Sequence, residues 1–276
     1  MHPFEKLTVP DQSVGIHWFG QSSFALKDVT GFIVYVDPYF PRDRPPDRFI
    51  HAEPPIDETD LHVDAALLTH DHGDHTCPET LARIAHSHPS TRYVGPPEAI
   101  DRLRQLQIPE QQLVTIEAGM SKPVGSMLVN AVWSKPPKGL PADGIEPPDT
   151  THLGYVVDTN GVRVYVSGDP VNTFAEHDEL LEPIRALNPD IGLLTTHPHE
   201  GEFPFFEGSA KTASRLSLKA AIPAHYNCFV RRNYDPHAWS KVVEGQEVKS
   251  IIIPYNRSLL YPTNSPSSDG EGPCNR

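Results

Sequence analysis

The sequence predicts an α/β fold made of two halves, in which two β-sheets pack against each other and helices lie on the outside. Two observations support this prediction. The 276 residues are enough for a large core, in one domain or in two fused halves. The predicted strands also form two clusters along the chain, and helical patterns follow each cluster, as expected for two αβ units that pack through their sheets.

The first half begins with short strands separated by glycine turns at Gly20 and Gly31. A proline-rich loop over 38–60 follows, and then a short apolar strand. Two helices come next, because apolar residues recur on one face of each segment and Pro78 opens the first of them. The predicted elements are strands at 14–19, 22–27, 32–37, 64–69 and 93–94, and helices at 78–86 and 97–107.

The second half returns to strands, and the pair Asn160-Gly161 predicts a tight hairpin between two of them. Residues 134–150 are a proline- and glycine-rich insertion, and 251–253 are expected to close the core. Residues 262–276 are rich in Ser, Pro, Gly and Asn, so we expect a disordered tail after a single domain at 1–261. The other elements are strands at 113–116, 127–132, 153–158, 162–167, 191–195 and 221–224, and helices at 178–187 and 208–218.

Composition excludes several classes of protein. The formal net charge of −13 argues against a nucleic-acid partner, because phosphate binding needs a basic face. Three cysteines without a CxxC pair argue against a disulfide framework. Residues 1–20 lack the pattern of a signal peptide, and no apolar run is long enough to span a membrane. We therefore expect a cytoplasmic protein with a small-molecule substrate, and either a monomer or a homo-oligomer.

The run from Thr69 to His75, Thr-His-Asp-His-Gly-Asp-His, contains the strongest functional signal. It places three imidazoles and two carboxylates in seven residues, directly after the apolar strand at 64–68. Imidazole and carboxylate together suit zinc, manganese or iron. A polar surface loop is the alternative interpretation, but the spacing favours a metal site.

Further candidate ligands also follow apolar strands. Asp169 comes after the strand at 162–167, His197 and His199 come after the strand at 191–195, and His225 comes after the strand at 221–224. Each residue alone would be an ordinary loop residue. If these strands share a sheet, however, their ends converge on one edge and bring the side chains to one place.

The order of these motifs resembles that of the metallo-β-lactamase superfamily. The chain has H-x-H-x-D-H at 70–75, then G-D at 168–169 and then P-x-H at 223–225, each after a strand. The opening 16–24, the triplet Val36-Asp37-Pro38 and the stretch 222–227 are similar to the branch that contains ascorbate-6-phosphate lactonase. The resemblance covers residues 14–255.

The resemblance implies a four-layer αββα sandwich of two mixed sheets, with one or two divalent metal ions, zinc or manganese, at its edge. It also assigns ligands: His70 and His72 to the first metal, Asp74, His75 and His225 to the second, and Asp169 as the bridge between them. Asp37 would orient a ligand imidazole, as metal-binding histidines usually require.

One ligand of the superfamily is missing from its usual place. Another histidine normally follows the strand that corresponds to 127–132, whereas here the chain continues Trp133-Ser134-Lys135-Pro136. His152 is the nearest replacement, and it is either a ligand or an ordinary residue at a strand edge. Without it, the first metal would bind weakly or the site would hold one metal.

Two other groups are candidates for substrate contacts. His197 and His199 could line the substrate pocket, donate a proton or supply a ligand, or they could belong to a polar loop. The basic pairs Arg231-Arg232 and Lys135/Lys138 could hold a phosphate or carboxylate, or be solvated surface charges.

The predicted function is metal-dependent hydrolysis, in which a metal-bound water has a pKa lowered towards neutrality and attacks as hydroxide. Asp74 or Asp169 would accept a proton, and His199 would protonate the leaving group. The first hypothesis is a lactonase-like ester hydrolase acting on a small polar substrate, such as a phosphorylated sugar acid. A phosphodiesterase of the same fold and a non-catalytic metal-binding protein are the alternatives.

Overall fold

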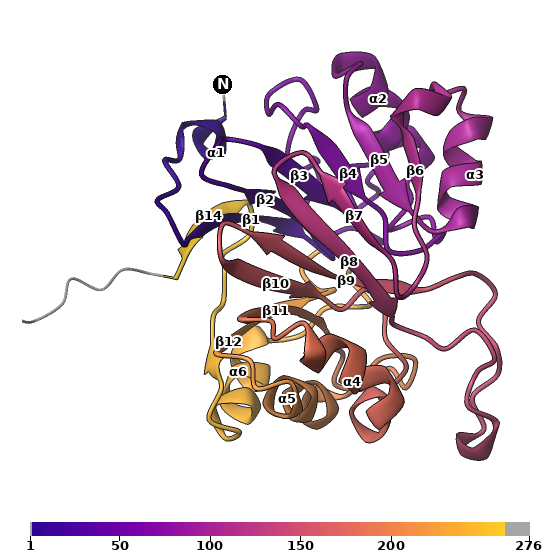
Figure 1. The fold of residues 1–276 in the computed structure, drawn as a ribbon, viewed down its shortest axis with the longest axis vertical. Coiled ribbons are helices and arrows are strands. Elements are labelled where there is room, and N and C mark those ends of the chain that lie inside the picture. The colour runs from indigo at the N-terminus through magenta and orange to yellow at the C-terminus, as the bar shows by residue number, and fades with distance from the viewer. Residues whose placement is uncertain (1, 263–276) are drawn as a thin grey trace, which may run out of the picture.

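The computed structural model describes residues 2–262, and it contains two seven-stranded sheets packed face to face between outer layers of helices (Figure 1). This four-layer arrangement confirms the predicted α/β fold class. Of the predicted tail, residues 263–276 lie outside the described part of the chain.

The first sheet has the order β14-β1-β2-β3-β4-β5-β6, and three helices accompany it. Its elements are β1 (Val14–Gly20), β2 (Ser23–Lys27), β3 (Ile33–Val36), β4 (Ala65–Leu67), β5 (Arg92–Gly95), β6 (Leu113–Thr115) and β14 (Arg257–Tyr261), with α1 (Pro3–Lys6), α2 (Pro78–Ser87) and α3 (Pro97–Gln105).

The second sheet has the order β13-β12-β11-β10-β9-β8-β7. Its elements are β7 (Ser121–Val124), β8 (Met127–Trp133), β9 (Leu153–Thr159), β10 (Val162–Val166), β11 (Ile191–Thr195), β12 (Ala220–Ala224) and β13 (Lys249–Ser250), with α4 (Asp178–Ala186), α5 (Phe206–Arg215) and α6 (Pro236–Glu244). Short 3₁₀ turns lie at η1 (Glu110–Gln112), η2 (Pro141–Asp143) and η3 (Phe174–Glu176).

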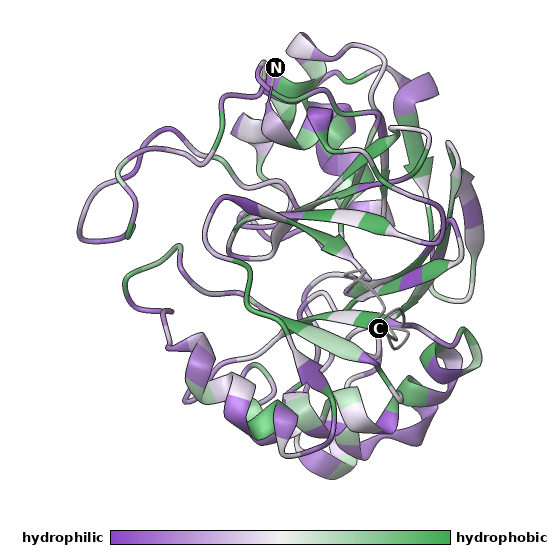
Figure 2. Cartoon of the chain, turned by 90° about the vertical axis from the view of Figure 1, so that its left-hand side faces the viewer, coloured by the Kyte–Doolittle hydropathy of each residue, from purple (hydrophilic) through white to green (hydrophobic). Residues whose placement is uncertain are grey.

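Alternation of side chains along the strands builds three apolar layers. On β1, Ile16 and Trp18 face the second sheet and join the central core, whereas Phe19 points to the outer layer. The outer face of the first sheet packs on α1, α2 and α3, and that of the second packs on α4, α5 and α6. In Figure 2 much of the strands is coloured as apolar, whereas the outer helices carry both apolar and polar residues.

The two sheets repeat one pattern of strand direction, although no repeat is visible in the sequence. In each sheet three antiparallel pairings are followed by three parallel pairings. The parallel strands β3, β4 and β5, and likewise β10, β11 and β12, therefore end at one edge of their sheet. Ligand-bearing loops collect at this kind of edge in α/β folds.

The sequence patterns missed two helices and three strands: α1, α6, β7, β13 and β14. The edge strand β7 reads Ser-Lys-Pro-Val and carries exposed residues, so it has no apolar run to recognise. The helix α6 had a usable signal, because Asp235 caps it through the backbone N–H of His237 and its buried residues Trp239 and Val243 are four apart. Residues 251–253 do not form a strand, although Ile253 is buried in the core.

None of the helices in residues 2–262 is long and apolar enough to cross a membrane.

His17 makes stability depend on pH. Its ring is buried between β1 and β14, with Nε2 at 2.9 Å from Asn256 Oδ1 and Nδ1 at 2.8 Å from Ser258 Oγ. Burial lowers its pKa to about 4, against 6.5 for an exposed histidine. Between these values the unfolded chain binds the extra proton, so stability falls as the pH drops from 6.5 towards 4.

We expect this term to reach about 2–3 kcal/mol near pH 4, because one pKa unit corresponds to about 1.4 kcal/mol. The free energy of unfolding can be measured in urea at several pH values for the wild type and for His17→Gln. The difference between the two proteins isolates the contribution of His17 from the titration of other groups. The variant should show the flatter pH dependence, and parallel curves for the two proteins would contradict the assignment to His17.

Candidate metal centre

A buried carboxylate fixes the start of the histidine-rich loop. After β4 ends, the Thr69 backbone N–H donates to Asp37 Oδ1 at 2.8 Å and the Thr69 hydroxyl donates to Oδ2 at 2.7 Å. Further along, the Thr76 hydroxyl donates to the carbonyl of His70 at 2.7 Å. Hydrogen bonds to Asp37 from the first sheet, together with one bond inside the loop, therefore set the loop geometry.

The first carboxylate of the run, Asp71, contacts a helix instead of joining a ligand set. It forms a two-bond ion pair with Arg102 of α3, and the Arg102 Nη2 to Asp71 Oδ2 distance is 2.8 Å. Bidentate pairs of this kind fix geometry as well as charge. Asp71 thus holds the loop against α3 and belongs to no potential ligand group in the described residues.

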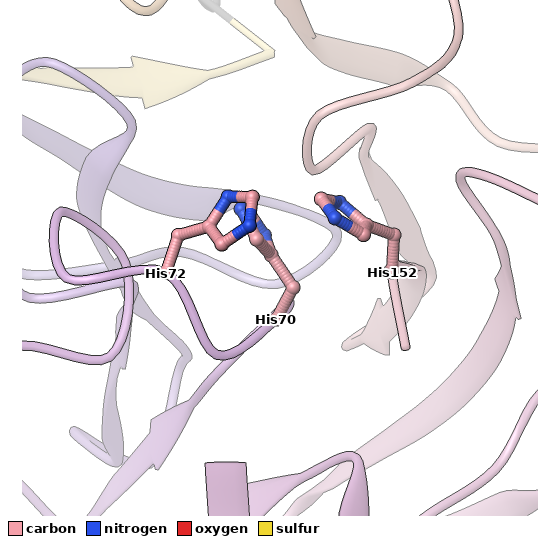
Figure 3. A group of neighbouring side chains, drawn as sticks. All are labelled: His70, His72 and His152. Carbon is pink, nitrogen blue, oxygen red and sulfur yellow. The ribbon is translucent and has the colours of Figure 1, made fainter. Parts of the chain in front are cut away.

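His70, His72 and His152 form the first potential ligand set. Their ligand atoms lie within 4.8 Å of one another, and His152 approaches from the second half of the molecule, facing the pair from the first half (Figure 3). The rings of His70 and His152 stack with centroids 4.0 Å apart. His152 therefore completes a group of three histidines with His70 and His72.

The sequence contained a signal for this position of His152. The hairpin turn at 160–161 makes β9 and β10 antiparallel, and the structure pairs Tyr155 with Val166. If this register is continued three residues before Tyr155 and three residues after Val166, His152 lies opposite Asp169. His152 is therefore expected beside Asp169, although it belongs to no motif.

Asp74, His75 and His225 form the second potential set, with ligand atoms again within 4.8 Å. His75 is fully buried, and its Nδ1 lies 2.8 Å from Asp37 Oδ2. His225 follows β12 with a φ of 71°, which turns its side chain towards Asp74. Its Nε2 lies 3.8 Å from Asp74 Oδ2.

Asp169 joins the two sets. Its Oδ2 lies 3.2 Å from His75 Nε2, 3.6 Å from His225 Nε2 and 3.7 Å from His70 Nε2. Gly168 makes this position possible, because its φ is 58° and a Cβ there would lie 2.4 Å from the carbonyl oxygen of Leu153. The groups predicted for a bridged site are thus brought together.

The donors in these sets fit divalent cations. Within the described residues, the Nε2 atoms of His70 and His225 and both ring nitrogens of His152 are buried without a hydrogen-bond partner. Buried polar atoms are normally paired, so these unpaired ring nitrogens fit the role of ligands to a divalent cation. Asp37 accepts the Nδ1 proton of His75, so Nε2, which lies 3.2 Å from Asp169 Oδ2, is the nitrogen that a cation could bind.

The electrostatics also favour positive charge at this place. Burial opposes the charged form of His75, but the carboxylates of Asp169 and Asp37 outweigh it and raise the pKa of His75 well above the usual range. Burial likewise opposes the charge of Asp169, yet His75 and His225 hold the pKa of Asp169 well below its usual value. Zinc and manganese suit this set of imidazoles and carboxylates.

Gln21 is a residue of the centre that the sequence patterns did not identify. Its Nε2 donates to Asp74 Oδ2 at 3.1 Å, and its backbone bridges to the loop after β12, with His225 N–H donating to the Gln21 carbonyl at 3.0 Å. Gly20 was a possible signal in the sequence, because it marks the turn between β1 and β2 in which Gln21 has a φ of 53°. Gln21 thus links the first sheet to the second ligand set.

The structure gives His197 and His199 different surroundings. His197 is buried, and its Nδ1 accepts hydrogen bonds from the backbone N–H groups of His199 and Glu200 at 3.2 and 2.9 Å. His199 is exposed. Neither histidine belongs to a potential ligand set in the described residues, and neither lines the two cavities beside the centre.

Two cavities open beside the metal centre. One, of about 590 Å³, is lined by Asp74 together with Arg48, Arg231 and Arg232, and we name it the arginine cavity. The other, of about 570 Å³, is lined by His72 and by four acidic residues, and we name it the acidic cavity. The four residues are Asp143, Glu146, Asp149 and Glu202. Each ligand set therefore has its own opening.

Comparisons with known proteins agree with this geometry. The family model for the beta-lactamase superfamily domain matches residues 33–226. A UPF0173 metal-dependent hydrolase of Myxococcus xanthus is 29% identical over 248 residues, which cover 87% of this chain and 80% of the relative. Another from Archaeoglobus fulgidus is 27% identical over 265 residues, covering 89% and 98%.

Among solved structures, Igni18, a metallo hydrolase of Ignicoccus hospitalis, superposes with a TM-score of 0.68 at 20% identity. The match covers 91% of this chain and 99% of that chain, and it shows that the two share a fold. None of these matches identifies the lactonase branch. The chain therefore belongs to the beta-lactamase superfamily, with the metallo-β-lactamase fold and with metal-dependent hydrolases among its relatives.

Proposed function

We propose that the protein is a metal-dependent hydrolase that opens a lactone, or cleaves another ester, of a small polar substrate. The observation that carries the proposal is the pair of ligand sets that share Asp169, each next to its own cavity. The metal-dependent hydrolases among its relatives support the same class of reaction.

When bound, divalent ions supply a Lewis acid and lower the pKa of a coordinated water towards neutrality. His70, His72 and His152 would hold one ion, Asp74, His75 and His225 the other, and Asp169 both. Side chains of the protein would position the substrate and accept a proton.

Asp74 is our candidate proton acceptor. It lines the arginine cavity and is held by Gln21, whereas Asp169 is almost fully buried. A general base must first lie within hydrogen-bond distance of the substrate, and Asp74 meets this requirement better than Asp169 does. Since His199 lines neither cavity, solvent in the open cavities is the source of the leaving-group proton in this proposal.

A phosphodiesterase is the second candidate function. Two adjacent ligand sets with a shared carboxylate suit two ions that hold the attacking and leaving oxygens of a phosphate diester. This candidate uses the same residues, so only the substrate distinguishes the two functions.

The test is elemental analysis of the purified protein, followed by assays of the zinc- and manganese-loaded forms. We expect two metal equivalents per chain and turnover of lactones or carboxylic esters. Turnover of bis(p-nitrophenyl) phosphate with inert lactones would replace the first function by the second. Tight metal binding without turnover of either class would indicate a non-catalytic metal-binding protein.

A further inference from the structure

The two cavities beside the metal centre differ in charge. The arginine cavity has three arginines against Asp47 and the candidate ligand Asp74. The acidic cavity has Lys135 against its four acidic residues. In a chain with a formal net charge of −13, three arginines on one cavity wall are a local reversal of the overall charge. The centre therefore lies between openings with opposite electrostatic preference.

Long-range pairing builds the arginine cavity. The loop after β3 and the loop after β12 meet at a bridge between Phe49 and Phe229. On one side of it the Ile50 N–H donates to Cys228 O at 2.9 Å, and on the other the Val230 N–H donates to Arg48 O at 2.9 Å. This short ladder places Arg48 beside the segment that carries Arg231 and Arg232.

The three arginines differ in whether their guanidinium groups already form ion pairs within the protein. Arg232 pairs with Glu200 at 3.1 Å and with Glu202 at 3.5 Å. The guanidinium of Arg48 lies over the rings of Phe49 and Phe229, with centroid distances of 5.3 and 5.6 Å. Its face is therefore packed while its N–H donors keep their charge.

Arg231 is exposed, and within residues 2–262 it has no ion-pair partner. Its guanidinium is thus a free charge on the cavity wall, with a donor geometry that matches an oxyanion.

We propose that the arginine cavity binds an oxyanion group of the substrate, a carboxylate or a phosphate, through Arg231 and Arg48. The acidic cavity repels the same group, so the substrate lies with its anionic end on the Asp74 side of the metal centre and its neutral end on the His72 side. This assignment rests on the proposed function, because it orients a substrate at that centre. It makes Arg231 a specificity-determining residue.

The test measures binding of three small probes to the metal-loaded protein by calorimetry: phenylphosphonate, benzoate and the neutral benzamide. Arg231→Gln should weaken binding of the anion by about tenfold or more, the usual effect of losing a charge-assisted hydrogen bond. Benzamide binding should not change. The anion that loses more affinity identifies phosphate or carboxylate as the natural group.

Lys138→Gln is the matched control, because Lys138 is exposed and lines neither cavity. Arg48→Gln should show a smaller loss of anion binding, and thermal unfolding will separate any effect of losing its aromatic contacts. Equal effects of Arg231→Gln and Lys138→Gln, or anions that bind no more tightly than benzamide, would overturn the proposal. Binding that depends on Arg231 without turnover of any ester would instead reject the hydrolase and retain the anion site.

Discussion

Replacing Asp169 by asparagine will lower kcat/KM by about 10²–10³-fold or more, the usual cost of removing a charged group from a preorganised site. Asp169 is the carboxylate that faces His70, His75 and His225 together, so its charge serves both ligand sets. Asparagine keeps the size of the side chain and removes that charge. Elemental analysis should therefore show fewer than two metal equivalents, alongside steady-state assays.

Asp158→Asn is the control for this variant. Asp158 lies at the opposite end of the same β9–β10 hairpin, half-exposed, and pairs with Arg163 at 3.2 Å. Surface pairs contribute little, so its metal content and turnover should match the wild type. If Asp169→Asn kept both metals and full turnover, the bridging role would be wrong.

Replacing Asp37 by asparagine will weaken metal binding by about 10–100-fold, as is typical for partners of ligand histidines. Asp37 Oδ2 accepts from the Thr69 hydroxyl and from His75 Nδ1, and Oδ1 accepts from the Thr69 backbone. An amide NH₂ at Oδ2 would face two donors. The proton of His75 would then move to Nε2, which removes the lone pair directed at the centre.

The same change should lower the free energy of unfolding by about 1–3 kcal/mol, because buried donors lose their acceptor. Asp28→Asn separates the two effects. Asp28 is buried at the other end of the β2–β3 hairpin and accepts from the backbone of Thr30 and Phe32, both at 2.9 Å. That variant should lose stability and keep its metal affinity in a metal titration. Wild-type affinity in Asp37→Asn would show that Asp37 does not orient His75.

The sequence was sufficient to predict that most residues of the potential ligand sets lie together, since this depends on local features. The run from His70 to His75 is contiguous, and Asp169 and His225 each follow an apolar strand. Parallel strands end together, so the rule that gathers loop residues at one sheet edge brings these side chains to one place. His152 was left open because it precedes its strand, and only the hairpin register brings it opposite Asp169.

Other features of the site depend on contacts between distant segments and could not be predicted. Asp149 lies in the insertion at 134–150 and approaches His72 Nε2 to 3.1 Å, although nothing in its local sequence marks it. The arginine cavity exists because Phe49 pairs with Phe229, and no periodicity encodes that pairing. His199 is the converse case, since it also follows a strand but is exposed and joins no potential ligand set in the described residues.

The position of β14 constrains the order in which the protein can fold as it is synthesised. β14 pairs with β1 along the register from Val14 with Tyr261 to Trp18 with Arg257, so nearly the whole described chain separates the two partners. A nascent chain leaves the β1 edge unpaired until all of the second half has been made. Unpaired edges promote association between chains, and contacts so distant in sequence form slowly. The first half of the molecule therefore depends on the last strand to protect its edge, and chains that stop before Arg257 should aggregate during synthesis.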